Sequence, residues 1–247
     1  MSRKSRQKAA EELAEIEIAE SDVVAVEDDA DDAELAENLD EAEVELILDD
    51  KSAPEDRAEE GPLDETEANP VRPYVDLGGV KVVPREGLHL RLEVEEGSKR
   101  VVAVGLDFAK STLQVQPFAA PRSTGLWHEI REQIADQIRK QGGTTEEVDG
   151  PFGPEIRAEI PLAAGSEGAV AGQTSRLARF VGVDGPRWFL RGVIAGDATV
   201  HPEAAEKIEE LFRSVVVVRG NEPMPPRDLI PLHMPKANPT DPAPQVV

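Results

Sequence analysis

The chain has 247 residues and a formal net charge of −23, and most of that charge lies in its first quarter. Residues 1–70 hold 26 acidic and 6 basic residues, whereas residues 71–247 hold 24 acidic and 21 basic ones. The sequence contains no cysteine, which excludes disulfides, thiolate metal ligands and a cysteine nucleophile.

Neither a membrane span nor a secretory signal is indicated. No stretch approaches the roughly 20 apolar residues that a membrane helix needs. The basic start MSRKSRQK is followed by AAEELAEIEIAE and not by an unbroken apolar segment, which argues against a signal peptide. We therefore expect a cytoplasmic protein with no membrane partner.

Residues 1–70 are predicted to form an acidic, disordered arm. They contain no aromatic residue, and their high like charge leaves too little apolar surface to offset the entropy of the chain. Two pieces, residues 9–20 and 34–48, have the composition of transient helices. The arm is either a solubilising tail, which we favour, or a short acidic and hydrophobic motif that folds onto a partner.

Residues 71–220 are predicted to form one globular domain that begins with antiparallel strands. Apolar residues alternate with polar ones, or form β-branched runs, in LGGVKVVP, GLHLRLEVEEG, RVVAVGL and TLQVQPF. In the second of these, Leu88, Leu90 and Leu92 share one face, and His89, Arg91 and Glu93 share the other. We expect that second face to be in contact with solvent.

Two helices interrupt the strands. In STGLWHEIREQIADQIRKQGG, apolar residues recur every four positions, and Ser123 or Thr124 is expected to cap the first turn. In HPEAAEKIEELFRS, Pro202 suits the first helical position. VVVVRG then predicts a buried final strand. The order of strands, helix, strands, helix and strand predicts an α+β fold with a mainly antiparallel sheet and two main helices.

Residues 221–247 are rich in proline and are predicted to form an extended tail. The segment PMPPRDLIPLHMP could dock on its own domain or on another protein. Its candidate partner contacts are Pro225, Pro226, Arg227 and Leu229.

No motif nominates a catalytic residue, a cofactor or a metal. GLDFAKST has Ala109 where a phosphate-binding loop needs glycine, and a strand follows it where that loop needs a helix. Ser166 lies in a loop of small residues without the strand and helix of a nucleophile elbow. The four histidines show no metal-ligand spacing: His89, His128, His201 and His233. We lean away from an enzyme.

The stretch RFVGVDGPRWFLRG, residues 179–192, predicts a β-hairpin with a turn within residues 184–186. A two-residue turn places Arg191 on the face of Phe180 and Phe189, with Arg179 opposite; a three-residue turn places Arg179 directly across from Arg191. The second register would indicate an anion site, because like charges that face each other need a counter-ion. The first, which we favour, indicates a sheet rim. The candidate contacts are Arg179, Arg187, Trp188 and Arg191.

Several phrases of the sequence resemble a known family, the actinobacterial proteins grouped as domain of unknown function 3710. They are VDLGGVKVVP, QVQPFAAPRSTGLWHEIREQI, GPRWFLRGVIAG and VVVVRGNEPMPPRDLIPLHMP, and the resemblance covers about residues 70–235. It implies an actinobacterial, cytoplasmic protein, but no activity and no site residues. RWFLRGVIAG with the following helix is also similar, more loosely, to the layout of Mog1 and PsbP-type domains, which are mostly binding modules. This resemblance implies an α/β/α sandwich, with the antiparallel sheet between helices.

Three functions follow as hypotheses. The first is a non-catalytic module that binds a protein partner. The second is a domain for an anionic small molecule or nucleotide, which requires Arg179, Arg187 and Arg191, with Arg122 or Arg176, to converge in a concave pocket. The third is association with nucleic acid under control of the acidic arm, which the net charge of −20 on residues 1–70 disfavours.

Overall fold

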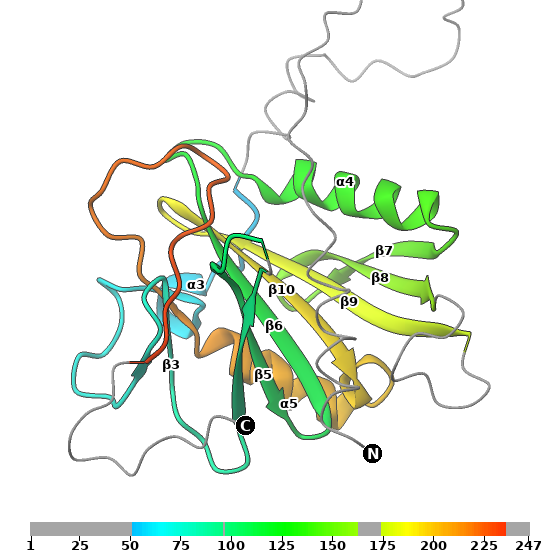
Figure 1. The fold of residues 1–247 in the computed structure, drawn as a ribbon, viewed down its shortest axis with the longest axis horizontal. Helices are drawn as coiled ribbons and strands as arrows, with labels where there is room; N and C mark the ends of the chain where they lie inside the picture. The colour runs from blue at the N-terminus through cyan, green and yellow to red at the C-terminus, as the bar shows by residue number, and fades with distance from the viewer. Residues whose placement is uncertain (1–50, 96, 163–173, 236–247) are drawn as a thin grey trace, which may run out of the picture.

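A seven-stranded antiparallel sheet forms the centre of the domain (Figure 1). The computed structural model describes residues 51–95, 97–162 and 174–235. The predictions for residues 1–50, for Ser166 and for the end of the tail concern residues outside these ranges. The spatial order of the sheet is β4-β5-β6-β10-β9-β8-β7. Its strands are β4 His89–Val94, β5 Val101–Phe108, β6 Ser111–Ala119, β7 Thr144–Gly150, β8 Gly153–Pro161, β9 Ser175–Asp184 and β10 Trp188–Gly196.

A smaller sheet packs beside the first, in the order β1-β11-β3-β2. Its strands are β1 Leu63–Asp64, β2 Val75–Asp76, β3 Val80–Val82 and β11 Val216–Val217. The strands predicted in LGGVKVVP and VVVVRG therefore exist, but they pair with each other in this second sheet and do not extend the main one. The sequence of a strand of two or three residues does not show which other strand it pairs with. Tertiary packing decides that pairing.

Helices cover both faces of the main sheet, as an α/β/α sandwich requires. Helix α4, Trp127–Lys140, lies across β7, β8 and β9 (Figure 1). Helix α5, Pro202–Arg213, lies on the opposite face, where Ile208, Leu211 and Phe212 join the larger apolar core. Two shorter helices complete the domain: α3 Arg57–Glu60 and the 3-10 helix η1 Asp197–Thr199. The predicted α+β class is confirmed.

Asp184, at the end of β9, holds the first turn of α4. Its carboxylate accepts hydrogen bonds from the backbone N–H groups of Leu126 at 2.8 Å and Trp127 at 3.3 Å. No side chain from the helix's own N-terminal segment caps it, so the predicted cap by Ser123 or Thr124 is wrong. The Asp184 carboxylate, 57 residues after Trp127 in the chain, caps the helix instead, because the β9–β10 hairpin brings it to the first turn of the helix.

The folded domain begins before residue 71. The side chain of Lys51 donates to the carbonyl of Gly185 at 2.5 Å, and the Ser52 N–H donates to the Asp184 carboxylate at 3.0 Å. Strand β1 pairs in parallel with β11. Residues 51–70 are thus part of the domain, and the expected boundary at residue 70 is corrected. Composition placed them in the arm because their contacts are made with residues far along the chain.

The C-terminal segment lies on its own domain. Backbone N–H groups of Arg227 and Ile230 donate to the carbonyls of Ala119 and Pro117 at 2.8 and 2.9 Å, so the segment continues the sheet beside the end of β6. Further along, the His233 N–H donates to the Leu77 carbonyl at 2.9 Å. Residues 227–233 therefore join the two sheets, because β5 pairs with β6 only as far as Val115 and leaves the last part of β6 unpaired on that side.

A strained turn joins β5 to β6. Phe108 pairs with Ser111, so the two turn residues are Ala109 and Lys110, with φ of 49° and 60°. A two-residue hairpin turn with positive φ at both positions suits glycine or asparagine, and here neither is present. The backbone conformation of these two residues is therefore energetically unfavourable.

Replacement of the second turn residue by glycine should stabilise the protein. Lys110→Gly relieves the left-handed conformation while it adds freedom to the unfolded chain, and the net gain in unfolding free energy should be about 0.5 to 1 kcal/mol. Urea unfolding measures it. The matched control is Lys207→Gly within α5, which should lose about 1 kcal/mol. Equal losses for both variants would contradict the left-handed turn.

Burial raises the pKa of Asp184 above 3.8, against its hydrogen bonds with Leu126, Ser52 and Trp127. The free energy of unfolding therefore decreases as the pH rises from 3.8, the ordinary pKa of an aspartate, through the higher pKa of Asp184 in the folded state. The unfolding free energy of the wild type, relative to Asp184→Asn, should fall across this interval and then level off. Urea unfolding between about pH 3 and pH 7 tests this, with Asp136→Asn as control. A relative stability that rises with pH would contradict it.

Candidate functional site

The turn of the β9–β10 hairpin lies two residues later than expected. Phe189 pairs with Asp184, and the Gly185 N–H donates to the Trp188 carbonyl at 2.7 Å, so the chain reverses at Pro186 and Arg187. Both predicted turns, at residues 184–185 and 184–186, are wrong. Proline favours the first turn position, and Trp188 folds over Gly185 so closely that a side chain there would overlap its ring.

This register separates the two central arginines. Arg179 lies opposite Ile194, and Arg191 lies opposite Gly182, so the two side chains are on opposite faces of the sheet. The anion site that would have followed from their meeting does not form. The faces agree with those expected from the two-residue turn, because Arg191 shares the face of Phe189.

Arg179 belongs to a structural ion cluster. Its guanidinium donates to the Glu155 carboxylate at 3.0 and 2.8 Å and to the Glu209 carboxylate at 2.7 Å. Burial lowers the pKa of Arg179, but the bonds and charges of the two glutamates outweigh this effect and leave its pKa raised. The cluster joins β8, β9 and α5, so Arg179 holds these three elements together.

The remaining predicted contacts are also spread over the domain. Arg187 lies in the hairpin turn and donates to the Gly220 carbonyl at 3.1 Å. Trp188 is fully buried, and its indole N–H donates to Asp64 at 2.9 Å. In the tail, Arg227 pairs with Glu129, Leu229 bridges to Phe118, and Pro225 and Pro226 are exposed. Arg122 is exposed, and Arg176 lines the cavity described below.

The face of the main sheet that carries α4 has two chemically different halves. On β8, β9 and β10 it is apolar and lies against the helix. On β4, β5 and β6 it is polar, and among the described residues no helix or strand lies over it. We call this second area the polar half-face, and its residues are His89, Arg91, Glu93, Gly105, Asp107, Thr112, Gln114 and Gln116, with Arg191 at its border.

The charged groups of the polar half-face form hydrogen bonds with neighbouring side chains of the same face. Arg91 donates to the Asp107 carboxylate at 2.8 and 3.2 Å, and the Thr112 hydroxyl donates to the same carboxylate at 2.7 Å. Gln114 donates to the Glu93 carboxylate. Four of these side chains are buried: Glu93, Gln114, Gln116 and Arg191. The network holds the side chains in fixed positions.

Arg191 is the most deeply buried cation of this network. It is 2% exposed and donates to the side-chain oxygen of Gln116. Burial lowers the pKa of Arg191 to about 10, and the negative charge of Glu93 opposes the shift. Arg191 therefore remains charged at neutral pH and serves the internal network.

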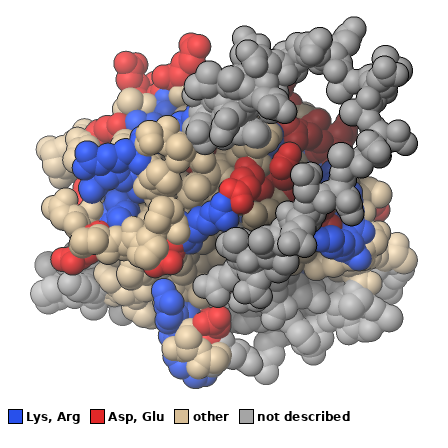
Figure 2. Space-filling model, turned by 90° about the horizontal axis from the view of Figure 1, so that it is seen from above, with Lys and Arg blue, Asp and Glu red and all other residues tan. Residues whose placement is uncertain are grey.

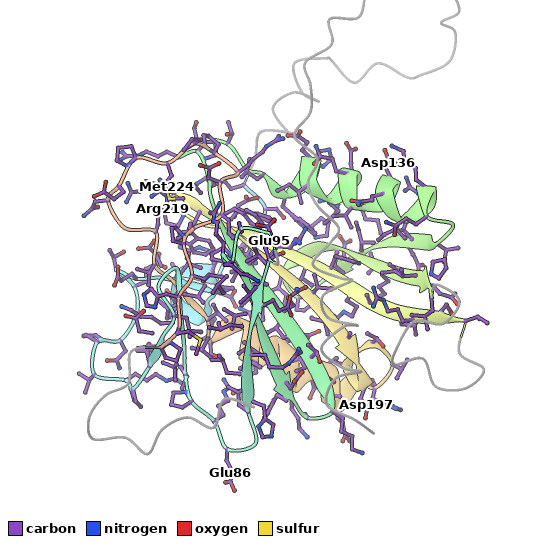
Figure 3. All side chains as sticks on the ribbon, viewed as in Figure 1. Glu86, Glu95, Asp136, Asp197, Arg219 and Met224 are labelled. Atoms are coloured by element: carbon purple, nitrogen blue, oxygen red, sulfur yellow. The ribbon has the colours of Figure 1, made fainter. Side chains whose placement is uncertain are left out.

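A cavity of about 430 Å³ opens at one end of the polar half-face, beneath the strained β5–β6 turn. In Figure 3, Glu86 and Glu95 mark the two ends of β4, and Asp197 marks the end of β10 on the cavity side. The lining residues are Gly87, His89, Asp107, Phe108, Ala109, Lys110, Ser111, Thr112, Gln114, Arg176, Val193, Ala195 and Gly196.

Sequence reasoning missed this site. The polar side of HLRLEVE was expected to face solvent, yet Glu93 is 4% exposed. Two signals could have indicated it: Gly105 inside the mostly apolar stretch RVVAVGL, and glutamines at alternate positions of TLQVQPF. Both show their meaning only when the strands are placed side by side.

The site does not have the composition of a metal centre. Among the residues described, no three His, Asp or Glu side chains are grouped so that they could hold a metal ion. The Ser111 hydroxyl, which lines the cavity, accepts the Ala198 N–H at 2.9 Å and is thus part of the backbone framework. Within residues 51–235, leaving out the undescribed positions, no helix is long and apolar enough to cross a membrane.

The fold and site thus define an α+β domain whose antiparallel sheet carries a polar half-face with a cavity. Residues 61–240 match the family "Protein of unknown function (DUF3710)", and the chain belongs to that family. The match begins ten residues before the expected domain start at Val71, in agreement with the extended N-terminal boundary.

No curated protein matches the chain. Among solved structures, the chain is similar to cyanobacterial PsbP (CyanoP) from Synechocystis sp. PCC 6803, with 12% identity and a TM-score of 0.33. That similarity covers 64% of this chain and 99% of the other.

Removal of Arg179, the central cation of the ion cluster, should lower the stability of the domain. Arg179→Ala leaves Glu155, which is 1% exposed, without its closest positive charge, so the unfolding free energy should fall by about 3 to 5 kcal/mol. The control Arg139→Ala, which breaks an exposed pair with Asp136, should change it by less than about 1 kcal/mol. Chemical denaturation measures both, and similar values would contradict the structural role.

Proposed function

We propose that the protein is a non-catalytic interaction module and that it binds a protein partner on the polar half-face. The observation that carries the proposal is the change in the α4 face of the sheet, which is apolar under the helix and polar beyond it. A polar surface held in fixed geometry and hollowed by a cavity is suited to recognition.

The chemistry of the polar half-face supports binding over catalysis. Asp107 is held by the Arg91 guanidinium and the Thr112 hydroxyl, so its charge is compensated. The Glu93 carboxylate accepts from Gln114 and lies in the field of Arg191. A general base needs a lone pair directed at a reacting group, whereas these carboxylates are engaged with neighbours on the same sheet.

The distribution of charge supports a protein partner over an anionic ligand. Arg179 and Arg191 lie on opposite faces, so the arginines that the second hypothesis required do not converge. On the polar half-face, Arg91 is paired with Asp107. On the face of the molecule seen in Figure 2, basic and acidic groups are interspersed and form no continuous basic surface, as a nucleic acid would require.

A steric variant tests the proposal. Thr112, which is partly exposed at the cavity, is replaced by arginine, and Thr144→Arg on the edge strand β7 is the matched control. The full chain, immobilised, is exposed to native lysate, and captured proteins are identified by mass spectrometry. We expect a protein that is retained by the wild type and by Thr144→Arg but reduced at least about tenfold by Thr112→Arg, the effect of one lost interface anchor.

Unfolding curves of both variants establish that the domain is folded. The proposal is overturned if every captured protein is also retained by folded Thr112→Arg, or if the wild-type chain captures none. A change at Thr144 that removes the partner equally would place the interface elsewhere.

A further inference from the structure

Lys110 is a cation on the wall of the cavity. It is the second residue of the two-residue β5–β6 turn, it lines the cavity, and it is exposed. Within the part of the chain that the structure describes, its ammonium group forms no hydrogen bond and no ion pair. The ammonium group is therefore available to a ligand that enters the cavity.

The turn holds Lys110 in an unfavourable backbone conformation. Its φ is 60° at a position that suits glycine or asparagine. Its carbonyl accepts the Asp197 N–H at 3.3 Å, which fixes the turn against the residue that follows β10. Residues in such conformations occur most often at ligand-binding and active sites, where they position a group. A role of the Lys110 side chain in binding accounts for the presence of a lysine in this turn.

The charges that line the cavity favour an anion. Lys110 and Arg176 are cations, and Asp107 alone among the described lining residues is acidic. The Asp107 carboxylate accepts from the Arg91 guanidinium at 2.8 and 3.2 Å and from the Thr112 hydroxyl at 2.7 Å, so its charge is already compensated. An anion in the cavity is thus attracted by Lys110 and meets no uncompensated carboxylate on the wall.

The rest of the lining suits the stem of one side chain. Phe108, Val193 and Ala195 contribute apolar surface, and the volume of about 430 Å³ is ample for a single side chain of a partner. Aspartate and glutamate combine a short apolar stem with an anionic end. Such a side chain can bury its methylene groups against the apolar lining while its carboxylate meets the ammonium group of Lys110.

We infer that the cavity receives the carboxylate of an aspartate or glutamate that the protein partner presents, and that Lys110 pairs with it. This inference rests on the proposed function and specifies what that surface recognises. The ammonium group donates to the carboxylate, so the contact is a charge-assisted hydrogen bond. A carboxamide would lack the attraction of opposite charges, and a second ammonium group would face Lys110 with the same charge.

Three blocked amino acids separate these chemistries: the N-acetyl methylamides of glutamate, glutamine and lysine. Each is titrated into the isotope-labelled full chain, and NMR follows the backbone N–H signals of residues 109–112. We expect the glutamate derivative to shift these signals and to bind at least about fivefold more tightly than the other two, the contribution of one ion pair. Added salt should reduce this preference. Preference for the glutamine or lysine derivative, or no shift with any of the three, overturns the inference.

Replacement of Lys110 gives a result that a purely structural role would not. Lys110→Gly relieves the left-handed turn and removes the charge, so the variant should be more stable than the wild type and yet lose the preference for the glutamate derivative. Lys110→Arg keeps the charge and should keep the preference. The matched control is Lys207→Gln, which removes an exposed lysine from α5 on the opposite face of the sheet and should leave binding unchanged. A preference retained by folded Lys110→Gly overturns the inference.

The acidic residues of the chain's own N-terminal arm are the alternative source of a carboxylate. Because the chain has no cysteine, Ala30→Cys offers a single site for a nitroxide spin label in the arm. We expect the label to leave the NMR signals of residues 109–112 unchanged. Selective broadening of these signals that is lost in Lys110→Gly would identify the arm as the occupant and overturn the assignment to a partner.

The two proposals fail separately. If Thr112→Arg abolishes partner capture while Lys110→Gly captures the partner as the wild type does and the glutamate derivative shows no preference, the interaction surface stands and the carboxylate inference is wrong. If the glutamate derivative binds at Lys110 but no captured protein depends on Thr112, the cavity is a site for free carboxylates and the proposed protein-interaction function is wrong.

Discussion

The carboxylate of Asp184 is the contact on which the arrangement of the domain depends. It accepts the first N–H groups of α4 on one side and the Ser52 N–H on the other, from a position that is 3% exposed. Three segments that are far apart in the chain therefore meet at one side chain. Because the carboxylate holds the start of α4 at the end of β9, the helix covers β7 to β9 and leaves the face of β4 to β6 to other contacts.

That placement explains why the sheet needs two kinds of surface. Beneath α4 the apolar side chains of β8 to β10 are removed from water, which is the main favourable contribution to folding. Beyond the helix, burial of apolar side chains would require another cover. The chain instead builds a network of amides, guanidinium groups and carboxylates that compensate each other's charge. Such a network also keeps its geometry, because each member is held by at least one neighbour.

The arginines of the β9–β10 hairpin show how the register of a hairpin decides whether charged side chains can form one site. All three lie within 13 residues of the sequence, and their spacing is compatible with a cluster. The turn at Pro186 and Arg187 sends Arg179 towards α5 and Arg191 towards the polar half-face. Each then meets acidic or amide partners on its own side, so both contribute to the stability of the domain.

The sequence by itself determined the local elements. Alternation and helical periodicity are properties of neighbouring residues, so the strands of the main meander, α4, α5 and the α+β class could be predicted from them, and the phrases around GPRWFLRGVIAG indicated the family. Tertiary structure alone decided the second sheet, the cap of α4 by Asp184, the inclusion of residues 51–70 and the burial of Glu93 and Gln114. Each of these depends on groups that are distant in the chain, and a hydrogen bond or a buried charge has no local pattern. The candidate site belongs to this second class, because it exists only where three strands place their polar faces side by side.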